Sequence, residues 1–213
     1  MKLYGFFRSS AAYRVRIALH LKGLSYEQVS VHLAKGRQFE AEYSARSPQN
    51  LVPVLYDDEN HRLLQSLAII QYLDEVHPEP PLLPGNPVER NRVQSLALLV
   101  ACEIHPLNNL RVLGYLTSVL KVTDEQKNAW YQHWVKTGFD ALERRLADEP
   151  QTGRFCHGHL VGLADIALVP QVANARRFKV DLSPYPTILR INEACHQLDA
   201  FRRAMPENQP DAE

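Results

Sequence analysis

Two neighbouring serines near the start of the chain have the chemistry to hold an anion. Ser9 and Ser10 follow a short apolar stretch and directly precede a predicted helix over residues 11–22. Hydroxyl groups, unpaired main-chain N–H groups and the positive end of a helix dipole all favour a bound anion. A thiol held there would ionise more easily, since a fall in its pKa from about 8.5 to about 6.5 corresponds to about 2.7 kcal/mol. Helix capping alone is the competing explanation for either serine.

Two further segments have the features of a site for a peptide ligand. Pro53 interrupts a β-branched run over residues 51–56, and because proline cannot donate to a strand ladder it predicts an edge, a bulge or a cis bond. A cis bond would turn the main chain of Val52 outward, ready to pair with a peptide. Gln65 and Ser66 precede a strongly amphipathic stretch and offer an amide, a hydroxyl and helix N–H groups to a carboxylate. Capping explains Ser66 but not Gln65.

The elements that must position these side chains alternate in type over the first 80 residues. Periodicity and turn residues predict the order strand, helix, strand, helix, strand, strand, helix. A strand–helix–strand unit followed by a hairpin and a last helix is typical of a thioredoxin-like α/β layer. The predicted strands are residues 2–6, 26–31, 51–56 and 61–64, and the predicted helices are residues 11–22, 39–44 and 66–76.

A proline-rich linker over residues 77–87 separates this layer from a region without strand signals. The pattern therefore predicts two domains, residues 1–81 and an all-helical domain over residues 87–213. The tail from Pro206 is polar and is expected to be disordered. Helices are predicted over residues 93–113, 124–146, 163–178 and 188–201.

Charge and cysteine usage narrow the classes of function. Lysine plus arginine number 24 and aspartate plus glutamate number 24, so no net field recruits nucleic acid or an anionic membrane. The chain lacks a leader pattern and a run of about 18 apolar residues, so no membrane partner is expected. The spacing of Cys102, Cys156 and Cys195 argues against a disulfide framework or a metal site and predicts a reducing, cytoplasmic location.

Together these motifs resemble the glutathione transferase fold, an α/β thioredoxin-like N-terminal domain followed by an all-α C-terminal domain. The match is closest to the zeta class, which includes maleylacetoacetate and maleylpyruvate isomerases. The resemblance spans nearly the whole chain, and its first and last runs are highly specific. The matching runs are residues 8–19, 65–70, 169–174, 177–181 and 184–186.

The resemblance implies specific roles for individual residues. Ser9 would donate a hydrogen bond to the thiolate of glutathione, with Ser10 in support, and these two with Arg8 form the expected catalytic set. Arg8, His105 and Arg177 are implied to bind the carboxylates of a substrate. The residues implied to bind glutathione are Ser9, Ser10, Ala11, Gln38, Val52, Pro53, Gln65, Ser66, His105, Asn109, Leu110 and Arg111.

The implied activity is a glutathione-dependent cis–trans isomerisation of a maleyl keto-diacid in aromatic ring degradation. The substrate would be maleylacetoacetate or maleylpyruvate, glutathione would be regenerated as a cofactor, and the protein would be a homodimer. Two alternatives stay open. One is a transferase that conjugates or dehalogenates small electrophiles, and the other is a binding protein that keeps the fold without catalysis.

Three positions need separate interpretation. The family signature commonly has cysteine after the two serines, where this chain has Ala11. We expect that cysteine to be auxiliary, because an external thiol supplies the sulfur. Gly162 replaces the usual Ser or Thr cap before Asp165, which affects helix stability and not chemistry. Arg176 and Arg177 are adjacent in a helix and point about 100° apart, so only one should face a site, and we favour Arg177.

Overall fold

The computed structural model describes residues 1–213, which form two compact units. The first unit is Met1–Pro81 together with His196–Glu213, and the second unit is Leu82–Cys195. The first boundary falls within the predicted linker. The end of the chain differs from the prediction, because residues 196–213 pack with the first unit and not with the helical region. The physical cause is that α9 packs against α1, where the buried guanidinium of Arg16 donates to the carbonyl of Ala204 at 3.0 Å.

The sheet of the first unit has the order β2–β1–β3–β4. Its first two strands are parallel and the other neighbours are antiparallel, which is the predicted thioredoxin-like arrangement. Each strand is one to three residues shorter than predicted, because the flanking residues leave the ladder. The strands are β1 (Lys2–Gly5), β2 (Glu27–Ser30), β3 (Val54–Tyr56) and β4 (Arg62–Leu64).

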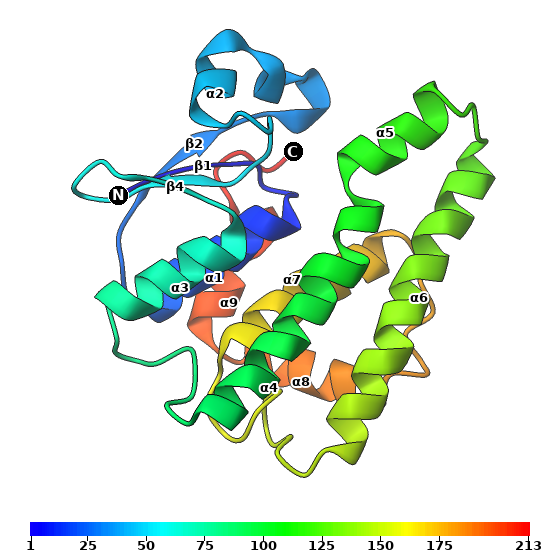
Figure 1. The fold of residues 1–213 in the computed structure, drawn as a ribbon. Helices are drawn as coiled ribbons and strands as arrows, with labels where there is room; N and C mark the ends of the chain where they lie inside the picture. Colours follow the sequence, from blue (N-terminus) through cyan, green and yellow to red (C-terminus); the bar gives the residue numbers. More distant parts are fainter. The chain divides into compact units, whose positions relative to one another are not determined.

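Helices cover both faces of this sheet. Figure 1 shows α2 on one side and α1 and α3 on the other. On the α2 side, Tyr43 packs against Val54 and Tyr4. Side chains alternate along a strand, so the fully buried Leu3 and Leu55 point towards α1 and α3. The helices are α1 (Ser10–Leu21), α2 (Ala41–Arg46), α3 (Ser66–Val76) and α9 (Asp199–Ala204), with short 3-10 helices at Leu33–Lys35, Arg37–Phe39 and Pro206–Asn208.

The second unit is built around α7, most of which is buried. α4 packs against α7, and α6 packs against a π-helical turn that continues α4. At that contact a Cβ on Gly138 would lie 2.2 Å from the side chain of Ile104, so only glycine allows the two helices to approach. The elements are α4 (Pro87–Leu98), the π-helix Leu99–Ile104, the 3-10 helix Pro106–Asn108, α5 (Leu110–Ser118), α6 (Asp124–Asp148), α7 (Leu163–Arg177) and α8 (Pro186–His196).

Two predicted helices are wrong as continuous elements. The stretch over residues 93–113 is divided because Pro106 has no N–H to donate, and Asn109 then starts a new helix by accepting from Val112 N at 3.1 Å. The stretch over residues 188–201 is divided at Leu198, whose backbone is extended. By length and composition alone, residues Pro87–Ser118 would pass as a membrane-spanning stretch. In the structure this stretch contains the division at Pro106.

The polar tail is ordered, so the expected disorder from Pro206 is wrong. The amide of Gln209 donates to the carbonyls of Arg203 and Met205, both at 2.8 Å. The carboxylate of Asp211 accepts from Ser30 at 2.9 Å. These partners lie at the end of α9 and in β2. The C-terminal segment therefore returns to the sheet near the end of β1 (Figure 1).

Candidate active site

The register of the sheet brings the three sequence motifs to one edge. Tyr4 pairs with Val54, and Val54 pairs with Leu64. The end of β1, the start of β3 and the end of β4 therefore lie side by side, and so do the turn after β1, the residues before β3 and the start of α3. The parallel pairing of Gly5 with Ser30 adds the segment that follows β2. The residues gathered in this way are Arg8, Ser9, Ser10, Ala11, Gln38, Val52, Pro53, Gln65 and Ser66.

Ser9 is the N-cap of α1, as its competing explanation requires. Its Oγ accepts from Ala12 N at 3.2 Å, and its own N–H donates to the carbonyl of Phe6 at 2.9 Å. Capping occupies one lone pair of the hydroxyl, which leaves its proton available to a ligand. The first turn of α1 contains no acidic residue. The two explanations are therefore compatible, since one hydroxyl can cap the helix and still donate to a guest anion.

The neighbours of Ser9 differ in exposure. Ser10 is buried, Ala11 is half-buried and Arg8 is exposed. The guanidinium of Arg8 lies 4.8 Å from the centre of the Phe7 ring. A cation on an aromatic face keeps its N–H donors at its edges, where a carboxylate can reach them.

The Val52–Pro53 peptide bond is cis, so this alternative among the three is confirmed. The residue before it is held tightly, because the hydroxyls of Tyr43 and Ser47 donate to the carbonyl of Leu51 at 2.7 and 2.8 Å. The main chain of Val52 makes no hydrogen bond within the protein. A fixed, half-buried residue with an unpaired N–H and C=O is suited to pairing with a peptide.

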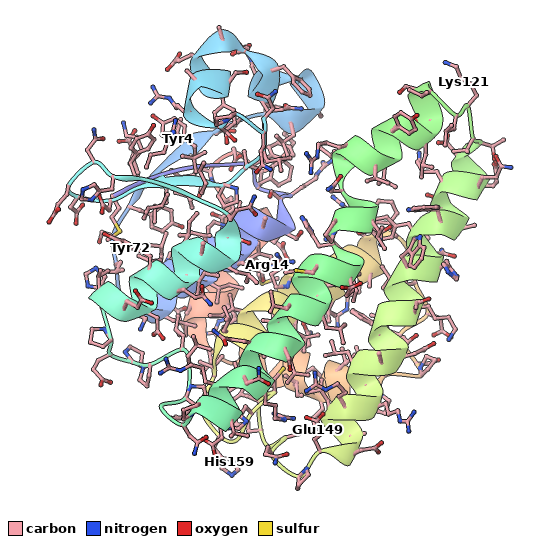
Figure 2. All side chains as sticks on the ribbon, in the orientation of Figure 1. Tyr4, Arg14, Tyr72, Lys121, Glu149 and His159 are labelled. Carbon is pink, nitrogen blue, oxygen red and sulfur yellow. The ribbon has the colours of Figure 1, made fainter.

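Gln65 has a backbone φ of 67°, which is unfavourable for a residue with a Cβ. Its side chain does not cap α3, and its amide donates instead to the side-chain oxygen of Gln49 at 2.8 Å. Ser66 is buried, and its hydroxyl accepts from Arg14 of α1 at 3.4 Å. Figure 2 labels Arg14. The first turn of α3 also contains no acidic residue, so its N–H groups beside a buried cation favour a carboxylate.

Gln38 adds a buried acceptor to the same edge. Its side chain is 8% exposed, and its Oε1 has no hydrogen-bond partner. This oxygen therefore keeps the capacity to accept a hydrogen bond from a ligand.

The predicted site residues between 105 and 111 lie where the π-helix gives way to α5 in the second unit. His105 connects the π-helix to the 3-10 turn, and its N–H donates to the carbonyl of Val100 at 3.0 Å. Asn109 caps α5, so its side-chain oxygen is already used within the protein. Leu110 is 58% exposed and Arg111 is exposed. The structure brings these four residues together and gives Asn109 a structural role that the sequence did not indicate.

Arg177 ends α7 and has an aromatic support. Its guanidinium lies 5.0 Å from the centre of the Phe178 ring, and that ring stacks on Tyr131 at 3.5 Å and an interplanar angle of 9°. Burial raises the pKa of Tyr131 to about 12 despite the nearby Arg177, so the phenol stays neutral. The exposed side chain of Arg176 has no such ring contact. These contacts favour Arg177 as the positioned cation of the pair.

The two buried cysteines do not provide a competing nucleophile. Cys156 and Cys195 are buried and Cys102 is exposed. Burial raises the pKa of the Cys156 thiol well above its ordinary value, which keeps it protonated at neutral pH. No group of three or more His, Cys, Asp and Glu side chains is arranged to hold a metal ion.

Sequence reasoning missed the side chains that support the predicted ones. Gln49 holds the amide of Gln65, and Arg14 reaches Ser66. Gln49 lies in a loop without a pattern, and Arg14 reads as one of several basic residues in a helix. The close approach of α3 to α1 makes Arg14 a buried partner, and that contact has no local sequence signal.

Comparisons with known proteins identify relatives over the whole chain. A family model described as "Glutathione S-transferase, N-terminal domain" matches residues 3–81. The chain is 53% identical over 212 residues to the probable maleylacetoacetate isomerase of Vibrio cholerae, covering 99% of this chain and 97% of the relative. It is 50% identical over 212 residues to the maleylpyruvate isomerase of a Ralstonia species, covering 100% of both.

Solved structures are similar over the whole chain. A holo structure of maleylpyruvate isomerase, a bacterial glutathione S-transferase of the zeta class, has a TM-score of 0.98 and 49% identity, covering 100% of both chains. The maleylacetoacetate isomerase of Methylobacterium extorquens AM1, solved with bound malonate and glutathione, has a TM-score of 0.97 and 43% identity, covering 100% of both chains.

Proposed function

Since the chain belongs to the zeta class of glutathione transferases, the family of the maleylacetoacetate and maleylpyruvate isomerases, we propose that it is a glutathione-dependent cis–trans isomerase of maleyl keto-diacids. The substrate is maleylacetoacetate or maleylpyruvate, and the product is the corresponding fumaryl compound. The observation that carries the proposal is the Ser9 hydroxyl, which has an available proton at the acid-free start of α1.

The residues at the sheet edge fit glutathione group by group. A tripeptide offers a thiol, peptide groups and carboxylates. Ser9 would hold the sulfur, the main chain of Val52 would pair with a peptide group, and Gln65 with Ser66 would take the γ-glutamyl carboxylate. Gln38 would accept from a donor of the ligand with its unpaired oxygen. When bound, glutathione supplies a thiolate nucleophile that adds reversibly to the conjugated alkene and so permits rotation about it.

The protein's part in this chemistry begins with the ionisation of the sulfur. A hydrogen bond from the Ser9 hydroxyl and the N–H groups at the start of α1 both favour the thiolate over the thiol. Ser10, the first residue of α1, is buried beside Ser9. Lowering the thiol pKa by about two units would convert a few per cent of thiolate at neutral pH into most of the population. Ala11 does not prevent this, because the sulfur comes from glutathione.

Cationic side chains would give the proposed preference for a diacid. Arg8 and Arg177 are both exposed and both lie against an aromatic ring, at 4.8 and 5.0 Å. The family resemblance implies that Arg8, Arg177 and His105 bind the substrate carboxylates. Guanidinium groups pair with carboxylates in a bidentate way and stabilise negative charge that develops in the reaction.

The test is the stoichiometry of glutathione. Purified protein should convert a large excess of maleylacetoacetate or maleylpyruvate with substoichiometric glutathione, and the thiol should be recovered. Consumption of one thiol per turnover would contradict the isomerase and favour a conjugating or dehalogenating transferase. Retention of glutathione without turnover of either diacid would favour the binding protein. Initial rates with both diacids identify the preferred substrate.

The predicted homodimer and cytoplasmic location form part of the same proposal. Family resemblance supports the dimer, and three cysteines without a disulfide support the reducing compartment. Sedimentation of the purified protein tests the dimer, since a single species with twice the chain mass of 24.3 kDa is expected.

A further inference from the structure

The C-terminal segment holds the turn that carries Ser9. The N–H of Phe7 donates to Oδ2 of Asp211 at 3.1 Å, across 204 positions of sequence. The carbonyl of the same residue accepts from Nη2 of Arg16 at 3.0 Å, and Nε of Arg16 donates to the carbonyl of Ala204 at 3.0 Å. The N–H of Phe7 is thus held by Asp211 of the tail. Its carbonyl is held by Arg16, which in turn contacts the end of α9.

Asp211 is itself anchored by β2. The amide of Gln28 donates to its Oδ1 at 2.7 Å, and the hydroxyl of Ser30 donates to its Oδ2 at 2.9 Å. Because one carboxylate accepts from Gln28, Ser30 and Phe7 at once, it ties the turn to the edge strand. A half-buried carboxylate with three donors is a stiff anchor, since charge-assisted hydrogen bonds are shorter and stronger than neutral ones.

The turn is short enough to pass this restraint to the serine. Only Phe6, Phe7 and Arg8 separate the end of β1 from Ser9. The ring of Phe7 is 4% exposed and packs against Phe6 at 4.7 Å between ring centres. The strength of a hydrogen bond falls steeply when its length or angle departs from the optimum. A small shift of Phe7 would therefore weaken the bond that the Ser9 hydroxyl makes.

We propose that Asp211 and Arg16 are positioning residues that hold the Ser9 hydroxyl where it can stabilise the thiolate. The proposal rests on the proposed function, because it assumes that Ser9 faces a bound thiol. Neither side chain is assigned a contact with the sulfur. The C-terminal segment thereby becomes part of the glutathione site of the first unit.

Removing Asp211 distinguishes a positioning role from a direct electrostatic one, because the two roles change the thiol pKa in opposite directions. Removing a nearby negative charge favours an anion, so by Coulomb's law alone the loss of this carboxylate would lower the thiol pKa. Loss of position weakens the bond from Ser9 and raises the thiol pKa. Arg16 gives no such contrast, since both effects of its removal raise the pKa. The charged and titratable groups around the turn are Arg8, Tyr13, Arg14, Arg16, Tyr26, His32, Lys35, Asp211 and Glu213.

The experiment is ultraviolet titration of glutathione bound to the full-length protein. Asp211→Ala should raise the pKa of the bound thiol by about half a unit to one unit, a fall of about 3- to 10-fold in the ratio of thiolate to thiol at any given pH. Asp211→Asn should raise it by less, because the amide oxygen can still accept from Phe7. Glu207→Gln, which changes an exposed acid of the same segment, should leave the pKa unchanged.

The outcomes separate this proposal from the proposed function. An Asp211→Ala protein with an unchanged or lowered thiol pKa, alongside a raised pKa in Ser9→Ala, overturns the positioning role and leaves the function intact. A lower melting temperature with an unchanged thiol pKa overturns the positioning role as well, because the tail would then only stabilise the fold. An unchanged pKa in Ser9→Ala contradicts the proposed function instead. If Asp211→Ala does not fold, Asp211→Asn decides, and an unchanged pKa in that variant overturns the proposal.

Discussion

The N-termini of α1 and α7 treat negative charge in opposite ways. α1 has Ser9 as its N-cap and no acidic residue in its first turn. α7 has Gly162 as its N-cap and contains Asp165, which is fully buried and accepts from the N–H groups of Cys156 and Gly162 at 2.8 and 2.9 Å. The positive end of α7 is thus neutralised by its own chain, whereas that of α1 is left for a guest.

The same contrast separates α3 from α6. α3 has neither a capping side chain nor an acidic first turn, and it follows the unfavourable backbone of Gln65. α6 has a complete capping box between Thr123 and Gln126, with Asp124 and Glu125 in its first turn. Helix ends need acceptors for their first N–H groups, and in α6 the chain itself supplies them. At the start of α3 no side chain supplies one, and we propose that a ligand carboxylate takes this role.

Removing Asp165, which neutralises the N-terminus of α7, should have the largest effect on stability. Asp165→Ala removes the acceptor of one buried and one part-buried N–H group. An unpaired buried donor costs about 1–3 kcal/mol, so the free energy of unfolding should fall by about 1–6 kcal/mol. Chemical denaturation measures this. Asp148→Ala, which removes an exposed carboxylate at the end of α6, should change it by less than about 0.5 kcal/mol. Equal losses in the two variants would show that Asp165 does not stabilise the fold.

The other end of α7 should matter to binding and not to folding. Arg177→Ala removes a charged partner of the diacid, and a charged hydrogen bond is worth about 1.5–3 kcal/mol, so KM should rise by about 10- to 100-fold. Steady-state kinetics with a fixed glutathione concentration measure this. Arg176→Ala is the matched control and should leave KM within about twofold. An effect of Arg177→Ala on melting temperature alone would place that side chain outside the site.

A substitution at the N-terminus of α3 should stabilise the fold while it weakens the binding of glutathione. Gln65→Gly removes the cost of a positive φ, partly offset by the entropy of glycine, so the free energy of unfolding should stay equal or rise by up to about 1 kcal/mol. Loss of the amide should weaken glutathione binding by about fivefold. Gln65→Ala should weaken binding equally without the gain in stability. A less stable glycine variant would show that the backbone there is not strained.

The smallest expected effect is on the melting temperature at low pH. It comes from Asp57, a carboxylate of the first unit that accepts hydrogen bonds from the protein itself. Burial alone would raise the pKa of Asp57 in the β3–β4 turn, but hydrogen bonds from Tyr72 and from the main chain and ring of His61 lower it from 3.8 to about 2. A lowered pKa contributes stability above the unfolded value, so the wild type should lose this contribution as pH falls from about 4 to about 2. Asp57→Asn should show a shallower loss over that range in melting temperature against pH. Parallel curves would contradict the stabilising role.

The candidate residues at the edge of the sheet can be predicted from the sequence because they depend on local features. Ser9, Pro53 and Gln65 each depart from their surrounding pattern, and the strand order then places them at one edge. The cis bond before Pro53 is one of three alternatives that a strand interrupted by proline allows. The element order of the first 80 residues follows from periodicity alone.

The supporting contacts are not predictable in this way. Asp211 belongs to a polar tail that reads as disordered, and its partner Phe7 lies 204 positions away. Arg16 reads as a surface residue of a helix until α9 covers it. The breaks at Pro106 and Leu198 depend on which N–H groups find acceptors after packing. Local patterns determine elements, whereas buried charges are determined by contacts between distant elements.

Titration of the glutathione thiol on the wild-type protein, followed by its ultraviolet absorbance, tests the open end of α1 most directly. We expect the thiol of bound glutathione to have a pKa of about 6.5, compared with about 8.5 for a free thiol. In Ser9→Ala this pKa should return towards the free value. A wild-type complex whose sulfur titrates at the free value would contradict the claim that this helix end keeps a guest sulfur ionised.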